Sequence, residues 1–348
     1  MYYLYYAGMA ANRSTEQIGL ATSHDGIRYE RSNGNGLLLA VDPRSTWKDE
    51  RVCNPTVLHF KGEWLMFYQG AHVERTSGAT THAIGVARSS DGLVWTCEKE
   101  PVLSIDHMRR IQDGPAGNGG VIEPSILVDG DQLRMWFLSY AGSYRVGTKL
   151  YAAASADGGR SWTIDARPIL SSHQLGRFSI HYPQVVRSAT GLALWFTVRD
   201  YDTAACAICR MTLNASSTAD ELVQLLPPAP AGLRLSVRRR TTFEINGRMP
   251  RGVATLNLLA CRLVDGGRHY FGYAHSHLID PDAEETRLYY HGYHYDQQTR
   301  GPWMDIGSCM MRNGHAVGPH AAGLQRSPDP QAWDSFFVAD PFVVRTNG

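Results

Sequence analysis

The stretch Ile18-Gly-Leu-Ala-Thr-Ser-His-Asp25-Gly26 recurs as Ile84-Gly-Val-Ala-Arg-Ser-Ser-Asp91-Gly92 and again as Leu150-Tyr-Ala-Ala-Ala-Ser-Ala-Asp157-Gly158. The three Asp-Gly pairs are 66 residues apart. A fixed period of this kind indicates a repeat architecture. Each copy predicts an alternating strand followed by a turn, because Gly supplies the positive φ and Asp tolerates it. A second short strand is then expected to end in an aromatic residue, which is Tyr29, Trp95 or Trp162.

A further pair of strands precedes the second and third copies. Residues 55–60 and 63–68 form one such pair around Lys61-Gly62, and residues 124–128 and 132–137 form the other around Asp129-Gly130. One repeat is therefore predicted to be four antiparallel strands, and tandem four-stranded units are the blades of β-propellers. A fourth unit begins at His181-Tyr182-Pro183, and a fifth is expected to have strands over 256–263, 268–273 and 288–293.

The remaining copy is divided between the two ends of the chain. Trp47 precedes Asn54-Pro55 by seven residues, and Trp333 precedes Asp340-Pro341 by the same spacing. The chain then ends where a second strand should begin, and residues 2–6 supply that strand. We expect a single all-β domain over residues 1–348, a five-bladed β-propeller closed by pairing of the C-terminal strand with the N-terminal strand. No long segment keeps the 3.6-residue period of a helical fold.

The composition is that of an ordinary globular protein, with 43% hydrophobic and 19% charged residues. The net charge of +1 favours no nucleic-acid partner. The chain has no run of 18 apolar residues and starts with a strand-like segment rather than a signal peptide, so we expect a cytoplasmic protein that binds no membrane. The cysteines lie in apolar contexts that are typical of buried thiols.

A propeller places the first strands of its blades around a central axial pocket. We expect the residue before the proline of each first strand to face that axis. These residues are Asp340, Asn54, Glu123 and Tyr182, with His181 beside Tyr182 and with Asn257 as the equivalent in the fifth unit, which lacks the proline. Apolar packing would not select such a polar set. The alternative interpretation is that these groups only hold the channel together through hydrogen bonds.

Loops between the second and third strands should share the pocket face. They carry candidate substrate-binding residues, namely Arg13, His72, Arg145 and Arg199, whose side chains suit a polar or anionic ligand. Glu74 and Asp200 are reserve candidates for an acid, and residues 106–120 and 227–250 are candidate lids. No histidine or cysteine spacing predicts a zinc site. We expect no required cofactor, although such a channel could hold a Ca²⁺ or Na⁺ ion.

The segment Ala339-Asp340-Pro341-Phe-Val-Val, continued by Tyr2–Tyr6, resembles the first blade of glycoside hydrolase family 43 and its relatives, in circularly permuted order. The resemblance implies that Asp340 is the general base. It also implies that Glu123 occupies the position of a family Asp that tunes the pKa of the acid. The family's acid is a Glu on a later first strand, but this chain has His181-Tyr182-Pro183 there. His181 could be the acid, as in the related family 117.

Three functions remain open at this point. The first is an inverting glycoside hydrolase for a small glycoside or oligosaccharide, with Asp340 as base, His181 as acid and Glu123 as modulator. The second is a lyase, cyclase or isomerase that uses the same residues on a small metabolite. The third is a sugar-binding propeller without catalysis. The sequence predicts neither the substrate nor the oligomeric state.

Overall fold

The computed structural model is built almost entirely of β-strands. It describes residues 1–11, 15–111, 119–144, 147–175, 179–189, 191–200, 205–213, 234–238, 242–246, 253–255, 269–279, 283–296, 301–312 and 315–346. Within these ranges the helical segments have four residues each, α1 over Ile105–Met108 and a 3-10 turn over Ser172–Leu175. Neither of these described helices is long and apolar enough to cross a membrane.

The strands pair mostly with their neighbours in the sequence and form antiparallel units. The unit that holds both chain ends has the order β24 (Phe337–Arg345), β1 (Tyr2–Met9) and β2 (Glu16–Ser23), with β3 (Glu30–Arg31) and β4 (Leu37–Leu39) paired to β2. The next unit consists of β5 (Arg51–Phe60), β6 (Glu63–Val73), β7 (Thr80–Ser89) and β8 (Thr96–Cys97). It is followed by β9 (Gly119–Asp129), β10 (Gln132–Ala141) and β11 (Lys149–Ser155), with β12 (Thr163–Ile164) and β13 (Leu170–Ser171) paired to β11.

The remaining described strands form two four-stranded sheets and a separate hairpin. One has the order β14 (Ser179–Ser188), β15 (Gly191–Asp200), β16 (Ala205–Leu213) and β19 (Val253–Thr255). The other has the order β20 (His269–Ile279), β21 (Glu285–Asp296), β22 (Gly301–Arg312) and β23 (His315–Leu324). A separate hairpin of β17 (Arg234–Arg238) and β18 (Thr242–Asn246) falls within the segment that the sequence suggested as a lid.

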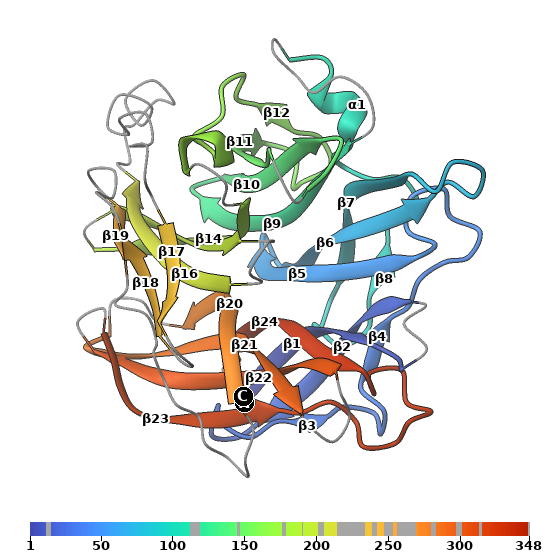
Figure 1. The fold of residues 1–348 in the computed structure, drawn as a ribbon. Helices are drawn as coiled ribbons and strands as arrows, with labels where there is room; N and C mark the ends of the chain where they lie inside the picture. Colours follow the sequence, from blue (N-terminus) through green and yellow to red (C-terminus); the bar gives the residue numbers. More distant parts are fainter. Residues whose placement is uncertain are drawn as a thin grey trace.

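The first strands of these units contact one another in turn around the centre of the molecule. β24 contacts β5, β5 contacts β9, β9 contacts β14, β14 contacts β20, and β20 contacts β24. These five strands lie innermost in Figure 1, and the other strands of each unit extend outward from them. The hydrophobic core is divided in the same way, because its clusters of buried residues lie between neighbouring units. Consecutive sheets are therefore packed face to face around a common centre.

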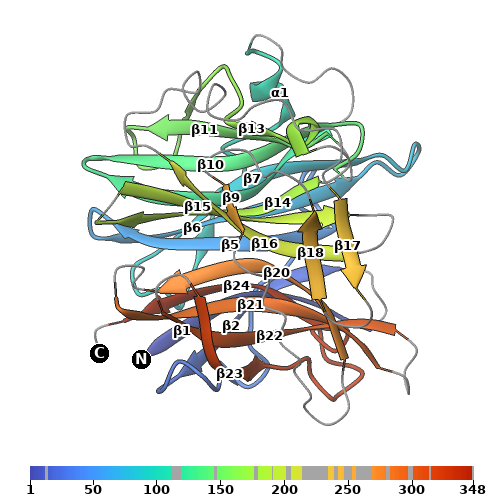
Figure 2. The same ribbon diagram turned by 60° about the vertical axis from the view of Figure 1, so that its left-hand side comes forward.

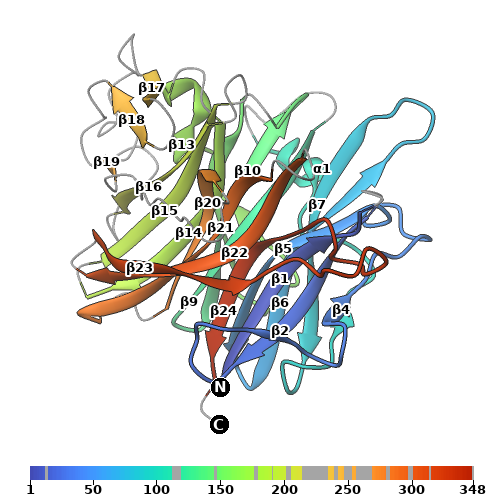
Figure 3. The same ribbon diagram turned by 60° about the horizontal axis from the view of Figure 1, so that its bottom comes forward.

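The two chain ends pair as the sequence predicts. β1 is antiparallel to β24 over most of its length, with Tyr2 opposite Arg345 and Met9 opposite Phe337. The backbone N–H of Thr346 donates to the carbonyl of Met1 at 2.9 Å. Figures 2 and 3 show the two termini side by side at one end of this unit. The C-terminal strand thus supplies the first strand of the sheet that the N-terminal residues continue.

The repeated Ser-x-Asp-Gly segments form the predicted turns. In the first copy the Ser23 hydroxyl accepts the N–H of Gly26 at 2.9 Å, and Asp25 Oδ1 accepts the N–H groups of Arg28 at 3.0 Å and Ile27 at 2.7 Å. Gly26 has a φ of 70°, which a residue with a side chain would rarely adopt. These N–H donors favour the ionised carboxylate and lower the pKa of Asp25 to about 2. Equivalent hydrogen bonds are present in the other two copies.

Two tryptophans explain why glycine follows isoleucine in the first two copies of the repeat. Trp333 lies over Gly19, where an added Cβ would be 2.7 Å from the indole ring. Trp47 lies over Gly85 in the same manner, and an added Cβ would again collide with the ring. In the third copy the equivalent residue is Tyr151, whose own ring is buried. The glycines therefore provide the space in which each indole packs on its sheet.

The last sheet corrects the predicted strands of the fifth repeat. The sequence suggested a first strand over residues 256–263, but β20 over His269–Ile279 is the strand that contacts β14 and β24. The residues expected in the second strand therefore lie in the first, and those expected in the third lie in β21. The prediction was wrong because this repeat lacks the X-Pro pair that marks the first strand elsewhere. Residues 256–268 are outside the described ranges.

The packing of Trp47 on Gly85 predicts a large effect from one methyl group. We expect Gly85→Ala to lower the free energy of unfolding by roughly 1–3 kcal/mol, because the added Cβ overpacks the indole. Urea unfolding followed by circular dichroism measures this change. Trp47→Phe should by itself lower the free energy of unfolding. In the Trp47→Phe background, however, Gly85→Ala should destabilise the protein less than it does in the wild type. Strictly additive effects of the two substitutions would contradict this packing.

Candidate functional site

Four first strands break their hydrogen-bond ladders at the residue before proline. Asn54, Glu123, Tyr182 and Asp340 have φ values of 52°, 56°, 51° and 53°. The pairing register shifts at each of these points, which identifies a β-bulge. A residue other than glycine at positive φ costs about 1–3 kcal/mol, and such strain gathers at functional sites. The bulges turn all four side chains toward one central cavity.

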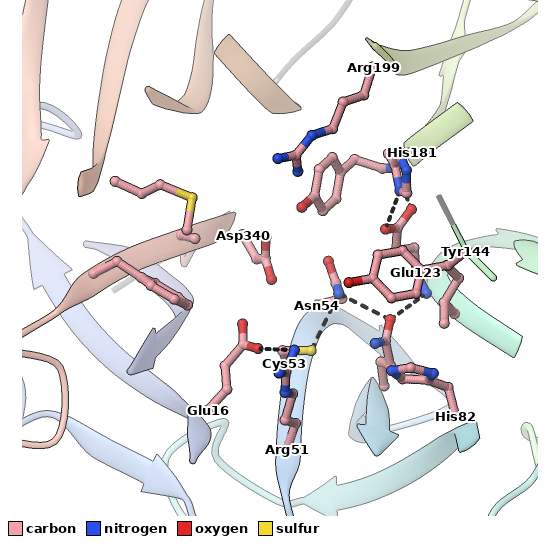
Figure 4. Close-up of a pocket in the computed structure, with 16 residues that line it drawn as sticks. Glu16, Arg51, Cys53, Asn54, His82, Glu123, Tyr144, His181, Arg199 and Asp340 are labelled. Carbon is pink, nitrogen blue, oxygen red and sulfur yellow. Dashed lines mark hydrogen bonds and ion pairs between the residues drawn. The ribbon is translucent and has the colours of Figure 1, made fainter. Parts of the chain in front are cut away.

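This cavity has a volume of about 150 Å³ and is lined mainly by polar side chains. Figure 4 shows how they are divided. Asp340 and Glu16 lie together on one side, Glu123 and His181 lie together on the other, and Asn54 lies between them. Asp340, Glu123 and His181 are each at least nine-tenths buried. Charged groups that are removed from water to this degree need specific partners.

Glu123 obtains its partners from the neighbouring first strand. Its Oε1 lies 3.0 Å from His181 Nδ1, and its Oε2 accepts the backbone N–H of Tyr182 at 2.5 Å. The bulge at Tyr182 exposes this N–H by interrupting the pairing of β14 with β15. The carboxylate thereby holds the His181 ring through Nδ1, so proton transfer between His181 and a ligand would use Nε2. The arrangement is that of a histidine oriented by an acid.

Asn54 is oriented by a second network. Gln69 Oε1 accepts the backbone N–H of Glu123 at 3.1 Å and the side-chain amide of Asn54 at 3.2 Å. The Asn54 Nδ2 group also lies 3.4 Å from Cys53 Sγ. These contacts use the nitrogen of the amide, and the buried Oδ1 has no hydrogen-bond partner. A buried acceptor without a partner suits a hydroxyl donor from a ligand.

Glu16, Cys53 and Asp340 form the other side of the cavity. One side-chain oxygen or sulfur atom of each lies within 4.8 Å of the other two, and all three residues are buried. Burial is the largest cause, and the nearby Asp340 the second, of a rise in the pKa of Glu16 to about 8, although Arg51 opposes it. Burial likewise raises the pKa of the Cys53 thiol. At neutral pH this cluster therefore favours a protonated Glu16 and a neutral thiol.

The same cluster is the place where a metal ion has to be considered. It would offer two carboxylates and one sulfur atom. Soft metals bind the thiolate, whereas burial favours the thiol form of Cys53. Arg51 Nη1 already lies 3.9 Å from Glu16 Oε2, so the guanidinium competes with a cation for this oxygen. We therefore assign no metal ion to this cluster.

A smaller cavity of about 20 Å³ adjoins the first and has room for about one water molecule. His277 lies there with Nδ1 2.7 Å from Gln184 Nε2 and Nε2 2.9 Å from the Val343 carbonyl. The amide nitrogen donates to Nδ1 and Nε2–H donates to the carbonyl, so neither ring nitrogen presents a lone pair to an ion. This histidine links the β14 and β24 units of the fold.

Six of the residues predicted from the sequence line the central cavity. They are Asp340, Glu123, His181, Asn54, Tyr182 and Arg199. His72 was predicted to bind substrate, but its Nδ1 lies 2.9 Å from Asp49 and it is not among the residues around this cavity. Glu74 is exposed and accepts the hydroxyl of Thr76, which does not suit a buried acid. Arg13, Arg145, Asn257 and the side chain of Asp200 lie outside the described residues, so their roles stay predictions.

Sequence reasoning missed two residues that the repeat itself could have revealed. Glu16 and His82 are 66 residues apart, each two positions before the start of a repeat copy, and both line the cavity. Burial lowers the pKa of His82 to about 3, and its Nδ1 lies 2.5 Å from the hydroxyl of Tyr140. The third equivalent, Thr148, is fully buried and donates to the carbonyl of Ile180. This repeat position is buried in all three copies.

Comparison with known proteins identifies the class of fold. No protein-family model and no curated protein sequence matches the chain. A glycosyl hydrolase from Bacteroides ovatus superposes with a TM-score of 0.55 at 12% identity, over 86% of this chain and 81% of its own. An exo-1,5-α-L-arabinanase from a bovine ruminal metagenomic library superposes with a TM-score of 0.52 at 15% identity, over 92% of both chains. Sucrose-6-phosphate hydrolase from Lactobacillus gasseri gives 0.57 at 12% identity, over 90% of this chain and 57% of its own.

At these identities the likeness concerns the fold alone. The chain has the β-propeller-like, all-β architecture that these glycoside hydrolases share. What it does must be argued from its own site.

The contacts of Glu123 predict how its variants behave, independently of any ligand. Glu123→Gln keeps an oxygen that can accept from Tyr182, so we expect the fold to survive with a small loss of stability. Glu123→Leu leaves the Tyr182 N–H and the His181 Nδ1 without that partner, and should cost about 3–5 kcal/mol. Urea unfolding of both variants measures the difference. Equal stabilities of the Gln and Leu variants would show that the carboxylate does not hold this part of the site.

Proposed function

We propose that the protein is a five-bladed β-propeller of the glycoside hydrolase type, in circularly permuted order, that acts on a small glycoside in its central cavity. The cyclic contacts of β24, β5, β9, β14 and β20 support the blade number. The permuted order is supported by the Ala-Asp-Pro motif of β24, which pairs with the N-terminal β1. The fold shared with solved glycoside hydrolases supports the class of reaction.

One observation carries the proposed chemistry. Asp340 and the Glu123–His181 pair lie on opposite sides of one central cavity. Hydrolysis with inversion needs a base for water on one face of the sugar and an acid at the leaving oxygen on the other. Asp340 takes a proton from water as the water oxygen attacks the anomeric carbon. His181 gives its Nε2 proton to the departing oxygen, and Glu123 orients the histidine.

The cavity suggests how much of the ligand is enclosed. Its volume of about 150 Å³ has room for several water molecules. That space suits one sugar ring or another small polar molecule, with any further unit outside the cavity. The Asn54 Oδ1 is a ready acceptor for a hydroxyl of this ring. Arg199, which also lines the cavity, adds a cationic group that suits polar or anionic substituents.

Hydrolysis of a panel of aryl furanosides and pyranosides tests the proposal. We expect the wild type to turn over one sugar, and Asp340→Asn to lower its kcat by about 10²–10⁴-fold because the base is lost. Asn tolerates positive φ, so this variant should keep the bulge and the fold. Asp131→Asn, in the exposed turn between β9 and β10, is the matched control and should retain full activity. Retained activity in Asp340→Asn would refute its role as the base.

The assignment of His181 as acid is tested through the leaving group. We expect His181→Ala to lower turnover of glycosides with poor leaving groups by about 10²–10⁴-fold, and of those with activated aryl groups much less. The reason is that a stable leaving anion needs no proton. His24→Ala is a suitable control, because His24 is exposed and the third repeat copy already has alanine there. An equal loss for all leaving groups would indicate a different role for His181.

A second candidate is a lyase, cyclase or isomerase of small metabolites. The small cavity favours this candidate as much as hydrolysis, because it would hold a compact substrate among polar side chains. Asp340 and His181 would then act as base and acid on one molecule without breaking a glycosidic bond. A folded wild type that turns over none of the glycosides would favour this candidate.

A further inference from the structure

Glu16 is a buried acid that the proposed reaction does not yet use. It begins β2, opposite Met9 of β1, and forms a parallel bridge with Arg51 of β5. Only 8% of its surface is exposed. Figure 4 shows its side chain reaching into the cavity beside Asp340, which lies nearer the middle. The two residues come from opposite ends of the chain, and the pairing of β1 with both β2 and β24 brings them together.

Charged and polar groups from the neighbouring strands face this pair. Arg51 Nη1 lies 3.9 Å from Glu16 Oε2, but the Arg51 side chain is 48% exposed and its effect is screened by solvent. Cys53 favours its neutral thiol, because burial raises its pKa. His291 Nδ1 accepts the backbone N–H of Asp340 at 3.1 Å, so it has no proton to give to the carboxylate 3.5 Å away. Arg199 of β15 lines the same cavity. The pKa of Glu16 stays raised although Arg51 lowers it, because burial is the largest cause.

Two carboxyl groups this close in a buried site ionise one at a time. Their nearest offered oxygen atoms are within 4.8 Å, a separation that one bridging water or hydroxyl can span. Burial together with the Asp340 charge shifts the pKa of Glu16 to about 8, so Glu16 retains its proton at neutral pH. The proposed role of Asp340 as base requires Asp340 to be the ionised member of the pair.

We propose that Glu16 is a positioning residue for Asp340, and that the two residues form a carboxylic acid–carboxylate pair that shares one proton. Glu16 keeps this proton throughout the reaction. Asp340, left ionised, takes the proton from the attacking water, and the water oxygen forms the new bond to carbon as the bond to the leaving oxygen breaks. Ionisation of Glu16 would place a second negative charge beside the base and beside the incoming water. This inference rests on the proposed function only for the role of the pair in turnover.

The shared proton is tested first without any substrate. A folded-state pKa above the unfolded value means that stability is fully present below about pH 4.5 and is lost as the pH rises toward about 8. We expect the free energy of unfolding of the wild type, relative to Glu16→Gln, to fall across this interval, because glutamine cannot ionise. Urea unfolding at closely spaced pH values measures both curves. Glu30→Gln, at an exposed acid on β3, should parallel the wild type.

Asp340→Asn provides a second measurement that does not depend on the glutamine variant. Removing the neighbouring charge should move the Glu16 transition to lower pH, while Asp131→Asn should leave it in place. A wild-type curve parallel to that of Glu16→Gln at every pH, or a transition that Asp340→Asn does not move, would overturn the inference.

Treatment with a chelator is expected to leave the unfolding curves unchanged. A curve that the chelator shifts would assign the cluster to a metal ion instead.

The role in turnover is tested with the glycoside that the wild type hydrolyses. We expect Glu16→Gln to lower kcat by no more than about tenfold and to extend the alkaline limb of the pH profile, because its amide stays neutral. A merely structural residue would lower kcat without moving that limb. If no glycoside is hydrolysed, the proposed function fails while the unfolding curves still decide whether the proton is shared. If hydrolysis occurs with parallel unfolding curves, the inference alone fails.

Discussion

The β-bulge before proline in four first strands is the constraint on which the site depends. Proline cannot donate to a strand ladder, so pairing must be interrupted where it stands. The preceding residue then takes positive φ at a cost in conformational energy, and the bulge re-aims its side chain. Repetition of this break in strands that contact one another in turn directs Asn54, Glu123, Tyr182 and Asp340 to one place.

The cavity stabilises its acidic residues in different ways. Glu123 is held by hydrogen bonds from a histidine ring and from the N–H exposed by the next bulge. Among the described residues no hydrogen bond to the Glu16 carboxylate is present, and burial favours its protonated form. Asp340 lies beside Glu16, across the cavity from Glu123. Acid–base chemistry requires neighbouring groups of which one favours its protonated form and another its ionised form.

The fold is maintained by contacts that have little to do with the chemistry. The indoles of Trp47 and Trp333 pack on glycines of the repeat, and the clusters of buried side chains lie between sheets. Such packing can be achieved by many sequences, which accounts for a shared architecture at 12–15% identity. Function follows from the residues that project into the cavity rather than from the scaffold.

The sequence by itself determined the repeat, its turns and the joining of the chain ends, because Asp-Gly turns, alternating strands and X-Pro pairs act over a few residues. It also indicated the bulge residues, since proline marks them. Only the tertiary structure decided that Glu16 lies beside Asp340, that His72 pairs with Asp49 instead of facing the cavity, and that the last sheet begins at β20. Strand alternation specifies which face a side chain occupies, but which strand ends meet at the centre depends on how distant segments pack.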